Sequence, residues 1–187
     1  NGPELTKIIQ EHYNPIIRKI RNIEKPVVAA VNGVAAGAGA SIALCCDIVV
    51  ATESASFIQA FSKIGLIPDS AGTFFLPRLV GLQKATALMM TAESISANDA
   101  EKMGMIYKVF SDESFVEKSW NLVSKLSQMP TKGLGLTKKL LNESFNNNLE
   151  QQLDMEDKCQ SIAGETNDFK EGVQSFLEKR KPNFKGE

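Results

Sequence analysis

Histidine and cysteine, the residues that hold most protein-bound zinc, are scarce in this chain. It has one histidine, His12, and three cysteines, of which Cys45 and Cys46 are adjacent. No two cysteines have the C-x-x-C spacing of a zinc or redox site, so we expect no metal site. An odd number of cysteines in apolar surroundings such as "ASIALCCDIVV" is typical of buried, reduced thiols and predicts a cytoplasmic protein. His12 is expected on a helix surface, without a catalytic role.

An excess of charge of either sign is also missing. The 187 residues include 21 lysines and arginines and 22 aspartates and glutamates, which gives a formal net charge of -1. A nucleic-acid partner is therefore not expected, because it would need a dominant basic face. No apolar run reaches the roughly 18 residues of a membrane span, and "NGPELTKIIQEH" lacks the pattern of a signal peptide.

Two short apolar runs predict the centre of an α/β fold. The runs "PVVAAV" (26–31) and "DIVVAT" (47–52) are typical of buried strands, and "AGASIALCC" between them is typical of a buried helix. A strand–helix–strand unit of this kind makes the two strands parallel. A further short strand is expected at 56–61. A turn, rather than a strand, is expected between Asn32 and a helix that begins near Gly37.

The rest of the chain is predicted to be helical. Ser96 is a plausible N-cap with Asp99 three residues on, and Asn14 before Pro15 is typical of a cap followed by the first helical residue. Helices are expected at 15–23, 82–92, 97–104, 114–128, 136–145, 149–164 and 167–181. We therefore expect an α/β core over residues 1–111 and a helical C-terminal region over residues 112–187.

The small residues of "NGVAAGAGAS" (32–41) require an explanation. A dinucleotide-binding fingerprint starting at Gly37 would need glycine or alanine where Ile42 stands, and a P-loop would need a lysine that this stretch lacks. Two interpretations remain open. A helix N-terminus could present backbone N–H groups to a developing oxyanion, or the small residues could serve only close packing of helix on strand.

Three motifs make the chain resemble a known family. The stretches "KPVVAAVNGVAAGAGASIALCCDIVVATESASF", "IGLIPDSAGTFFLPRLVG" and "FKEGVQSFLEKRKPNFKG" resemble, in order and spacing, the crotonase (enoyl-CoA hydratase/isomerase) superfamily. The resemblance implies a spiral of ββα units with a helical trimerisation region, and a homotrimer or a dimer of trimers. It also implies an acyl-CoA thioester as substrate, with no cofactor beyond the coenzyme A that the substrate carries.

The resemblance also assigns roles within the glycine-rich stretch. The backbone N–H of Ala38 would bind the thioester oxygen, and Gly37 and Phe61 would contact the substrate. The second oxyanion donor of the family lies upstream of these residues, so the chain is expected to be N-terminally shortened. The two glutamates of the family's hydratases fall on Ser41 and Phe61, and neither side chain is suited to the proton transfers of hydration.

One carboxylate stands at a position that several isomerases of the family share. Asp69 in "GLIPDSAGT" would remove a proton from the carbon next to the thioester and return it at another carbon. Apolar neighbours, with Phe57, Phe61, Ile64 and Leu66 as candidates, would make it a better base. The residues alone favour a turn or helix-cap role for Asp69, and it is the family position that favours catalysis.

The pattern most resembles the isomerases that convert epoxyphenylacetyl-CoA to oxepin-CoA and shift 3-enoyl-CoA to 2-enoyl-CoA. Phe176 and Lys179 match family positions that contact the adenine and phosphates of coenzyme A; otherwise they belong to a solvated helix end. The alternatives are an enoyl-CoA hydratase of fatty-acid oxidation, a thioester hydrolase, and a non-catalytic crotonase-like subunit that only assembles with partners.

Overall fold

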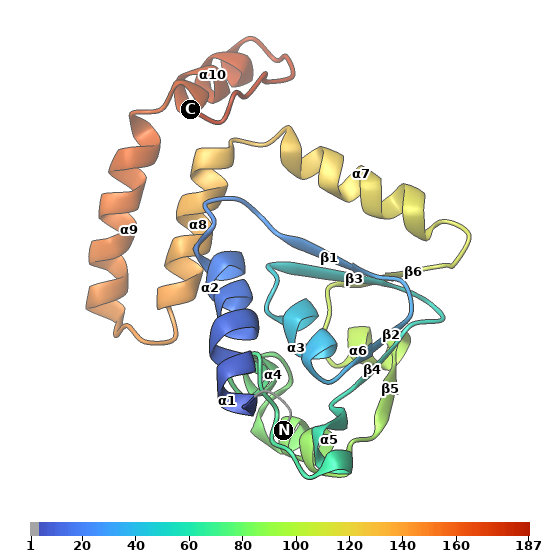
Figure 1. The fold of residues 1–187 in the computed structure, drawn as a ribbon. Coiled ribbons are helices and arrows are strands. Elements are labelled where there is room, and N and C mark those ends of the chain that lie inside the picture. Colours follow the sequence, from blue (N-terminus) through green and yellow to red (C-terminus); the bar gives the residue numbers. More distant parts are fainter. Residues whose placement is uncertain (1–3) are drawn as a thin grey trace. The chain divides into compact units, whose positions relative to one another are not determined.

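The computed structural model describes residues 4–187, which form two compact units (Figure 1). Unit 1 contains residues 4–21 and Val27–Trp120. Unit 2 contains Asn22–Pro26 and Asn121–Glu187. Both β-sheets of the described chain belong to unit 1, whereas the elements of unit 2 are helices and their connections.

Two three-stranded sheets form the frame of unit 1. In the first sheet β3 lies between β1 and β6, and all three strands are parallel. In the second sheet β4 lies between β2, which is parallel to it, and β5, which is antiparallel. The strands are β1 Val28–Val31, β2 Val34–Ala36, β3 Ile48–Thr52, β4 Ser56–Ile58, β5 Ser94–Ser96 and β6 Lys108–Phe110.

The parallel pair expected from the two apolar runs is confirmed. Val28 pairs with Ile48 and Val31 with Ala51, so the whole of β1 lies beside β3. Residues 49–52 of β3 are buried, as the central strand of a covered parallel sheet should be. The helix α3 (Ala38–Leu44) connects the two strands and has the buried small residues that the sequence predicted.

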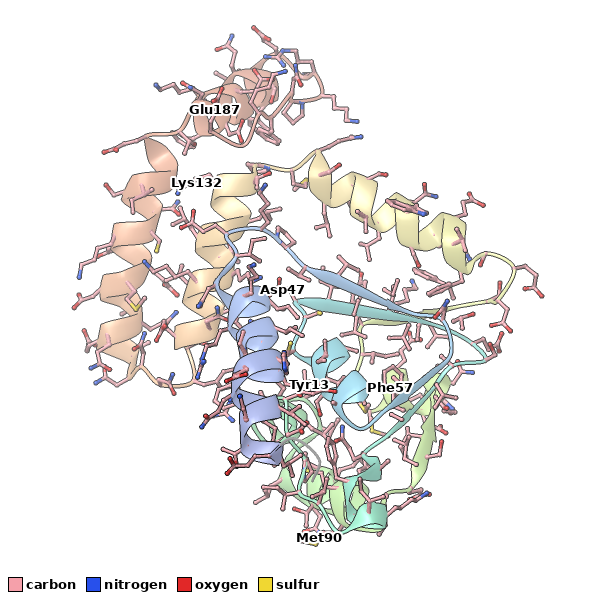
Figure 2. The ribbon with its side chains drawn as sticks, viewed as in Figure 1. Tyr13, Asp47, Phe57, Met90, Lys132 and Glu187 are labelled. Carbon is pink, nitrogen blue, oxygen red and sulfur yellow. The ribbon has the colours of Figure 1, made fainter. Side chains whose placement is uncertain are left out.

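Helices surround these sheets. An N-terminal helical segment comprises α1 (Leu5–Ile8), a π-helical turn (Ile9–Tyr13) and α2 (Asn14–Asn22). The carboxylate of Asp47, labelled in Figure 2, accepts a hydrogen bond of 3.0 Å from Arg21 at the end of α2 and one of 2.8 Å from the N–H of Val27. The other helices of unit 1 are a 3₁₀ helix Ala60–Ile64, α4 Gly72–Val80, α5 Leu82–Thr91 and α6 Ala97–Lys102.

The core of unit 1 is built mainly from small and aliphatic side chains. Phe57, labelled in Figure 2, is the largest side chain that is fully buried, with 1% of its surface exposed. The following residues pack around it: Ala35, Ala40, Leu44, Val49, Ala51, Ala55, Leu76, Ala85, Leu88, Ala97, Ala100, Met105 and Ile106. Because many of these residues are alanines, the helices lie close to the sheets. This close packing holds the segments between helices and strands in defined positions.

Several local predictions differ from the structure, among them the strand expected at 56–61, since β4 ends at Ile58. The expected turn after Asn32 contains a strand, β2. Asn14 is helical (φ -58°, ψ -40°) and lies inside a continuing helical segment, because the chain before it is already helical. Helix α4 was not expected, and α8 (Thr131–Glu143) begins at Thr131 instead of at residue 136. The predicted N-cap Ser96 is confirmed, since its Oγ accepts the N–H of Asp99 at 3.1 Å.

Unit 2 is made of helices and an ordered C-terminal segment. It contains the second part of α7 (Phe115–Ser127), α8, α9 (Leu149–Gly164) and α10 (Asn167–Leu177). Asn148 forms a capping box with Gln151 at the start of α9. Asp168 lies in the first turn of α10, and its buried carboxylate accepts hydrogen bonds from the segment after the helix. The donors are the N–H groups of Lys185 at 2.6 Å and Gly186 at 2.8 Å. These bonds hold the end of the chain against the start of α10.

The sequence analysis expected no membrane-spanning segment. Among residues 4–187, no helix combines the length and the apolar character needed to cross a lipid bilayer.

Candidate active site

The junction of β2 and α3 is held against the end of β4. Gly37 has φ +53° and ψ -122°, a conformation open to glycine but costly for residues with a Cβ. Its N–H donates to the carbonyl oxygen of Ile58 at 2.8 Å. A Cβ on Gly37 would lie 3.7 Å from the ring of Phe61, which is itself 7% exposed. Gly37 and Phe61, both expected to contact substrate, therefore lie next to each other.

Ala38 is the first residue of α3. The N–H of a first helical residue has no acceptor within its own helix, because the chain four residues earlier is not helical. The next turn is regular, since the N–H of Ser41 donates to the carbonyl oxygen of Gly37 at 3.1 Å. The structure therefore shows Ala38 at the start of a helix, and its role as an oxyanion donor stays a prediction.

Asp69 lies in a tight turn that leads into α4. The N–H of Gly72 donates to the carbonyl oxygen of Asp69 at 2.9 Å, which closes a four-residue turn. The two central residues, Ser70 (φ +50°) and Ala71 (φ +61°), are both left-handed. Such turns normally have glycine, asparagine or aspartate at these positions. A residue with a Cβ costs roughly 1–2 kcal/mol in this conformation, so the turn is strained twice in succession.

Helix α3 meets this turn at one very close contact. A Cβ built on Gly72 would lie 2.6 Å from Oγ of Ser41 and 3.5 Å from Cβ of Pro68. A Cβ at residue 72 would therefore force Ser41 or the turn to shift, because α3 and α4 pack against each other here. Since Ala38 and Ser41 share the first turn of α3, this contact brings the turn of Asp69 against the helix that begins with Ala38.

The apolar side chains expected around Asp69 differ in burial. Phe57 and Phe61 are buried, and Asp69 is half-buried. Ile64 and Leu66, at the end of the 3₁₀ helix and in the loop after it, are 72% and 39% exposed. The shielding of the carboxylate by these four side chains stays a prediction.

Two buried polar side chains near these segments were not singled out from the sequence as unpaired groups. Ser41 is fully buried and Gln59, next to β4, is 3% exposed. Within residues 4–187, Oγ of Ser41 and both amide atoms of Gln59 have no hydrogen-bond partner. Buried polar groups are normally paired, so these are exceptions; among the described residues a further one is Oγ of Ser119 in α7. Whether a buried polar atom finds a partner depends on segments distant in the sequence, so the local sequence carries no signal of it.

The thiols and the histidine take no visible part in chemistry. None of the three cysteines forms a disulfide; Cys45 and Cys159 are buried and Cys46 is half-buried. A hydrogen bond with Cys46, together with burial, raises the pKa of the Cys45 thiol, so it remains protonated. His12 lies exposed on the N-terminal helical segment, as predicted. In the described part of the chain, no three His, Cys, Asp or Glu side chains gather where they could hold a metal ion.

Phe176 and Lys179 belong to unit 2 and lie near the end of α10. The ring of Phe176 is 82% exposed and lines an apolar cavity of about 440 Å³ together with Phe169, Val173 and Phe184. Lys179 has φ +55° just beyond the helix. Its N–H bonds to the carbonyl of Phe176 at 3.2 Å, and that of Arg180 to the carbonyl of Ser175 at 3.0 Å. This pair of bonds is a Schellman motif, with lysine at the position where glycine is usual.

Known proteins resemble the chain over its whole length. Residues 1–187 match the family model described as enoyl-CoA hydratase/isomerase. The chain is 46% identical to the 1,2-epoxyphenylacetyl-CoA isomerase of Escherichia coli (strain K12), over 99% of this chain and 71% of that protein. It is 43% identical to a probable enoyl-CoA hydratase of Rhodobacter capsulatus, over 99% of this chain and 72% of the relative.

A solved structure confirms the fold class. The crystal structure of an enoyl-CoA hydratase from Polaromonas sp. JS666 superposes with a TM-score of 0.92 at 36% identity. The superposition covers 99% of this chain and 72% of that one. The predicted α/β architecture with a helical C-terminal region is therefore confirmed.

Proposed function

The chain belongs to the enoyl-CoA hydratase/isomerase family, and we propose that it is an acyl-CoA isomerase that works through a thioester enolate. Its proposed substrates are 3-enoyl-CoA, converted to 2-enoyl-CoA, and epoxyphenylacetyl-CoA, converted to oxepin-CoA. Asp69 is the proposed acid and base, and the N–H of Ala38 is a proposed donor to the thioester oxygen. The observation that carries the proposal is the carboxylate of Asp69 in a strained turn whose last residue, Gly72, approaches Ser41 in the first turn of α3.

The proton transfer needs only one titratable group. The carboxylate of Asp69 would take a proton from C2 of a 3-enoyl thioester, and the electrons of that C–H bond would move toward the carbonyl. The resulting dienolate carries its negative charge largely on the thioester oxygen, where a backbone N–H stabilises it. The protonated Asp69 would then give the proton to C4, which leaves the double bond between C2 and C3.

The side chains at two other positions argue against hydration. The fully buried Ser41 and the buried Phe61 stand where the family's hydratases keep their two glutamates. Hydration needs a group that deprotonates water and a group that delivers a proton to carbon. Phenylalanine does neither, and serine is a weak base without an activating neighbour. Of the relatives reported above, the one named as an isomerase also supports this assignment.

The epoxide reaction makes a smaller demand on Asp69. Expansion of an epoxide fused to a six-membered ring into an oxepin rearranges bonds within the ring and needs less proton transfer. We therefore propose that stabilisation of the thioester, rather than the base, contributes most to that step. The similarity to the 1,2-epoxyphenylacetyl-CoA isomerase is the support for this substrate.

Binding of the coenzyme A part is proposed for the end of α10. The exposed ring of Phe176 offers a face for adenine, and Lys179 offers a positive charge for phosphate. The family resemblance further supports a homotrimer or a dimer of trimers and a cytoplasmic location, which we include in the proposal. The coenzyme A enters as part of the substrate, and no further cofactor is proposed.

A hydratase is the second candidate, because one relative is a probable enoyl-CoA hydratase. Product analysis separates the candidates. The purified protein is given a 3-enoyl-CoA, and the products are resolved by chromatography. We expect 2-enoyl-CoA as the first product. A 3-hydroxyacyl-CoA formed from 2-enoyl-CoA would indicate a hydratase, and free coenzyme A a thioester hydrolase. Binding without turnover would indicate a non-catalytic subunit.

A further inference from the structure

The turn that holds Asp69 contains a second polar side chain in direct contact with it. Oγ of Ser70 donates a hydrogen bond of 3.0 Å to Oδ1 of Asp69. Ser70 is 2% exposed, although serine is usually found at the surface. The hydroxyl therefore has the carboxylate of Asp69 as a fixed partner in a place that water does not freely enter.

The backbone at Ser70 makes this contact more informative. With φ +50°, Ser70 takes the left-handed conformation at the first central position of the turn, and Ala71 takes it at the second. Glycine would remove the strain at either position, because it has no Cβ. At Ala71 the side chain offers no polar group in return. At Ser70 the side chain supplies the donor to Asp69, and strained residues of this kind cluster at functional sites.

We propose that Ser70 is a positioning residue for the isomerase reaction. Its hydroxyl holds Oδ1 of Asp69 and so fixes the rotation of the carboxylate, which leaves Oδ2 as the oxygen that takes and returns the substrate proton. A fixed carboxylate spends more of its time in the reactive geometry, and this affects the chemical step rather than substrate binding. The inference rests on the proposed function, in which Asp69 is the acid and base.

Two glycine variants of the same turn form a matched test. Ser70→Gly removes strain and the hydroxyl, whereas Ala71→Gly removes strain alone. For Ser70→Gly we expect kcat for the shift of 3-enoyl-CoA to 2-enoyl-CoA to fall about 10- to 100-fold, the range for one hydrogen bond to a charged group. KM should change less than twofold, and Tm should stay the same or rise. Ala71→Gly should keep the kcat of the unaltered protein and have a similar or higher Tm.

In Ser70→Gly, a positioning role lowers kcat while Tm stays the same or rises. A merely structural role of Ser70 would lower both kcat and Tm. An unaltered kcat in Ser70→Gly would overturn the inference, as would equal losses of kcat in the two glycine variants. If Ser70→Gly does not fold, Ser70→Ala answers the same question, because it keeps the Cβ and lacks only the hydroxyl. A lower kcat at unchanged Tm would then support the inference, and an unchanged kcat would refute it.

A third variant separates this inference from the proposed function. If Asp69→Asn keeps full turnover, the proposed function fails, and the role of Ser70 fails with it. If Asp69→Asn is inactive and the Ser70 variants are fully active, only the positioning role is refuted.

Discussion

Replacing Gly72 by alanine tests the contact that fixes the turn of Asp69 against α3. Gly72 is the first residue of α4 and is buried, and its backbone is helical, so alanine suits its conformation. The added methyl group, however, would lie 2.6 Å from Oγ of Ser41. Real Cβ atoms keep larger distances, so Ser41 or the turn would have to move.

The expected cost follows from this overlap. One methyl group forced into a packed interior lowers the free energy of unfolding by about 1–3 kcal/mol. Gly39, within α3, is a matched control, because a Cβ there meets nothing within 4 Å. Since alanine is the better helix former, Gly39→Ala should raise the free energy of unfolding by about 0.5–1 kcal/mol.

A double-mutant cycle measures the contact between residues 41 and 72. It compares the urea unfolding of the unaltered protein, Gly72→Ala, Ser41→Ala and the variant with both substitutions. In Ser41→Ala the hydroxyl is gone, and the remaining Cβ of residue 41 lies 3.5 Å from the added methyl, an ordinary van der Waals distance. Gly72→Ala should therefore cost at least about 1 kcal/mol less in the Ser41→Ala background, within the usual range for residues in contact. If the costs of the two substitutions add within about 0.5 kcal/mol, the methyl group at residue 72 does not collide with the hydroxyl of Ser41.

Two further predictions concern the end of the chain. Hydrogen bonds from Arg180 and from the N–H of Asn183 lower the pKa of Glu171 from 4.5 to about 2. The contribution of the Glu171 carboxylate to stability is therefore complete above pH 4.5 and is lost as the pH falls toward 2. The difference in Tm between the unaltered protein and Glu171→Gln should narrow over this interval, and a constant difference would contradict the cause. Lys179→Gly removes the strain of a left-handed residue, so Tm should rise. It also removes the positive charge proposed for the phosphates of coenzyme A, so the affinity for a CoA ester, measured by calorimetry, should fall several-fold. An equal loss of affinity in Lys181→Ala, a lysine two residues further on, would contradict a specific role for Lys179.

The parallel pair β1 and β3 was predictable because local pattern and global fold agree there. Short β-branched runs on either side of a helix-forming stretch leave few topologies, and the buried small residues of α3 suit a helix packed on a sheet. Ser96 was predictable for a similar reason, since an N-cap depends on residues within one turn.

Strand β2 was not predictable from its own residues. Val34–Ala36 looks like part of a small-residue turn, and it is a strand because it pairs with Ser56–Ile58, twenty-two residues further along. The bond from Gly37 to Ile58 continues this pairing to the start of α3. Pairing between distant segments overrides weak local preference.

For the candidate site, the sequence predicted the position of Asp69 and a turn around it. It gave no indication that Ser70 and Ala71 are both left-handed, because serine and alanine do not favour that conformation. The turn also lies beside the close approach of Gly72 to Ser41, which are separated by thirty-one positions in the sequence. Strain of this kind depends on the surrounding fold and leaves no local signature.

The role of Asp69 can be measured most directly with Asp69→Asn in D₂O. Proton NMR follows a 3-enoyl-CoA, recording both the loss of the C2 protons and the appearance of the 2-enoyl product, beside calorimetric affinity for the same ester. We expect Asp69→Asn to bind the ester with an affinity within about twofold of the unaltered protein, and neither to exchange the C2 protons nor to form the product. Loss of the C2 protons in Asp69→Asn at the rate of the unaltered protein would show that Asp69 is not the base.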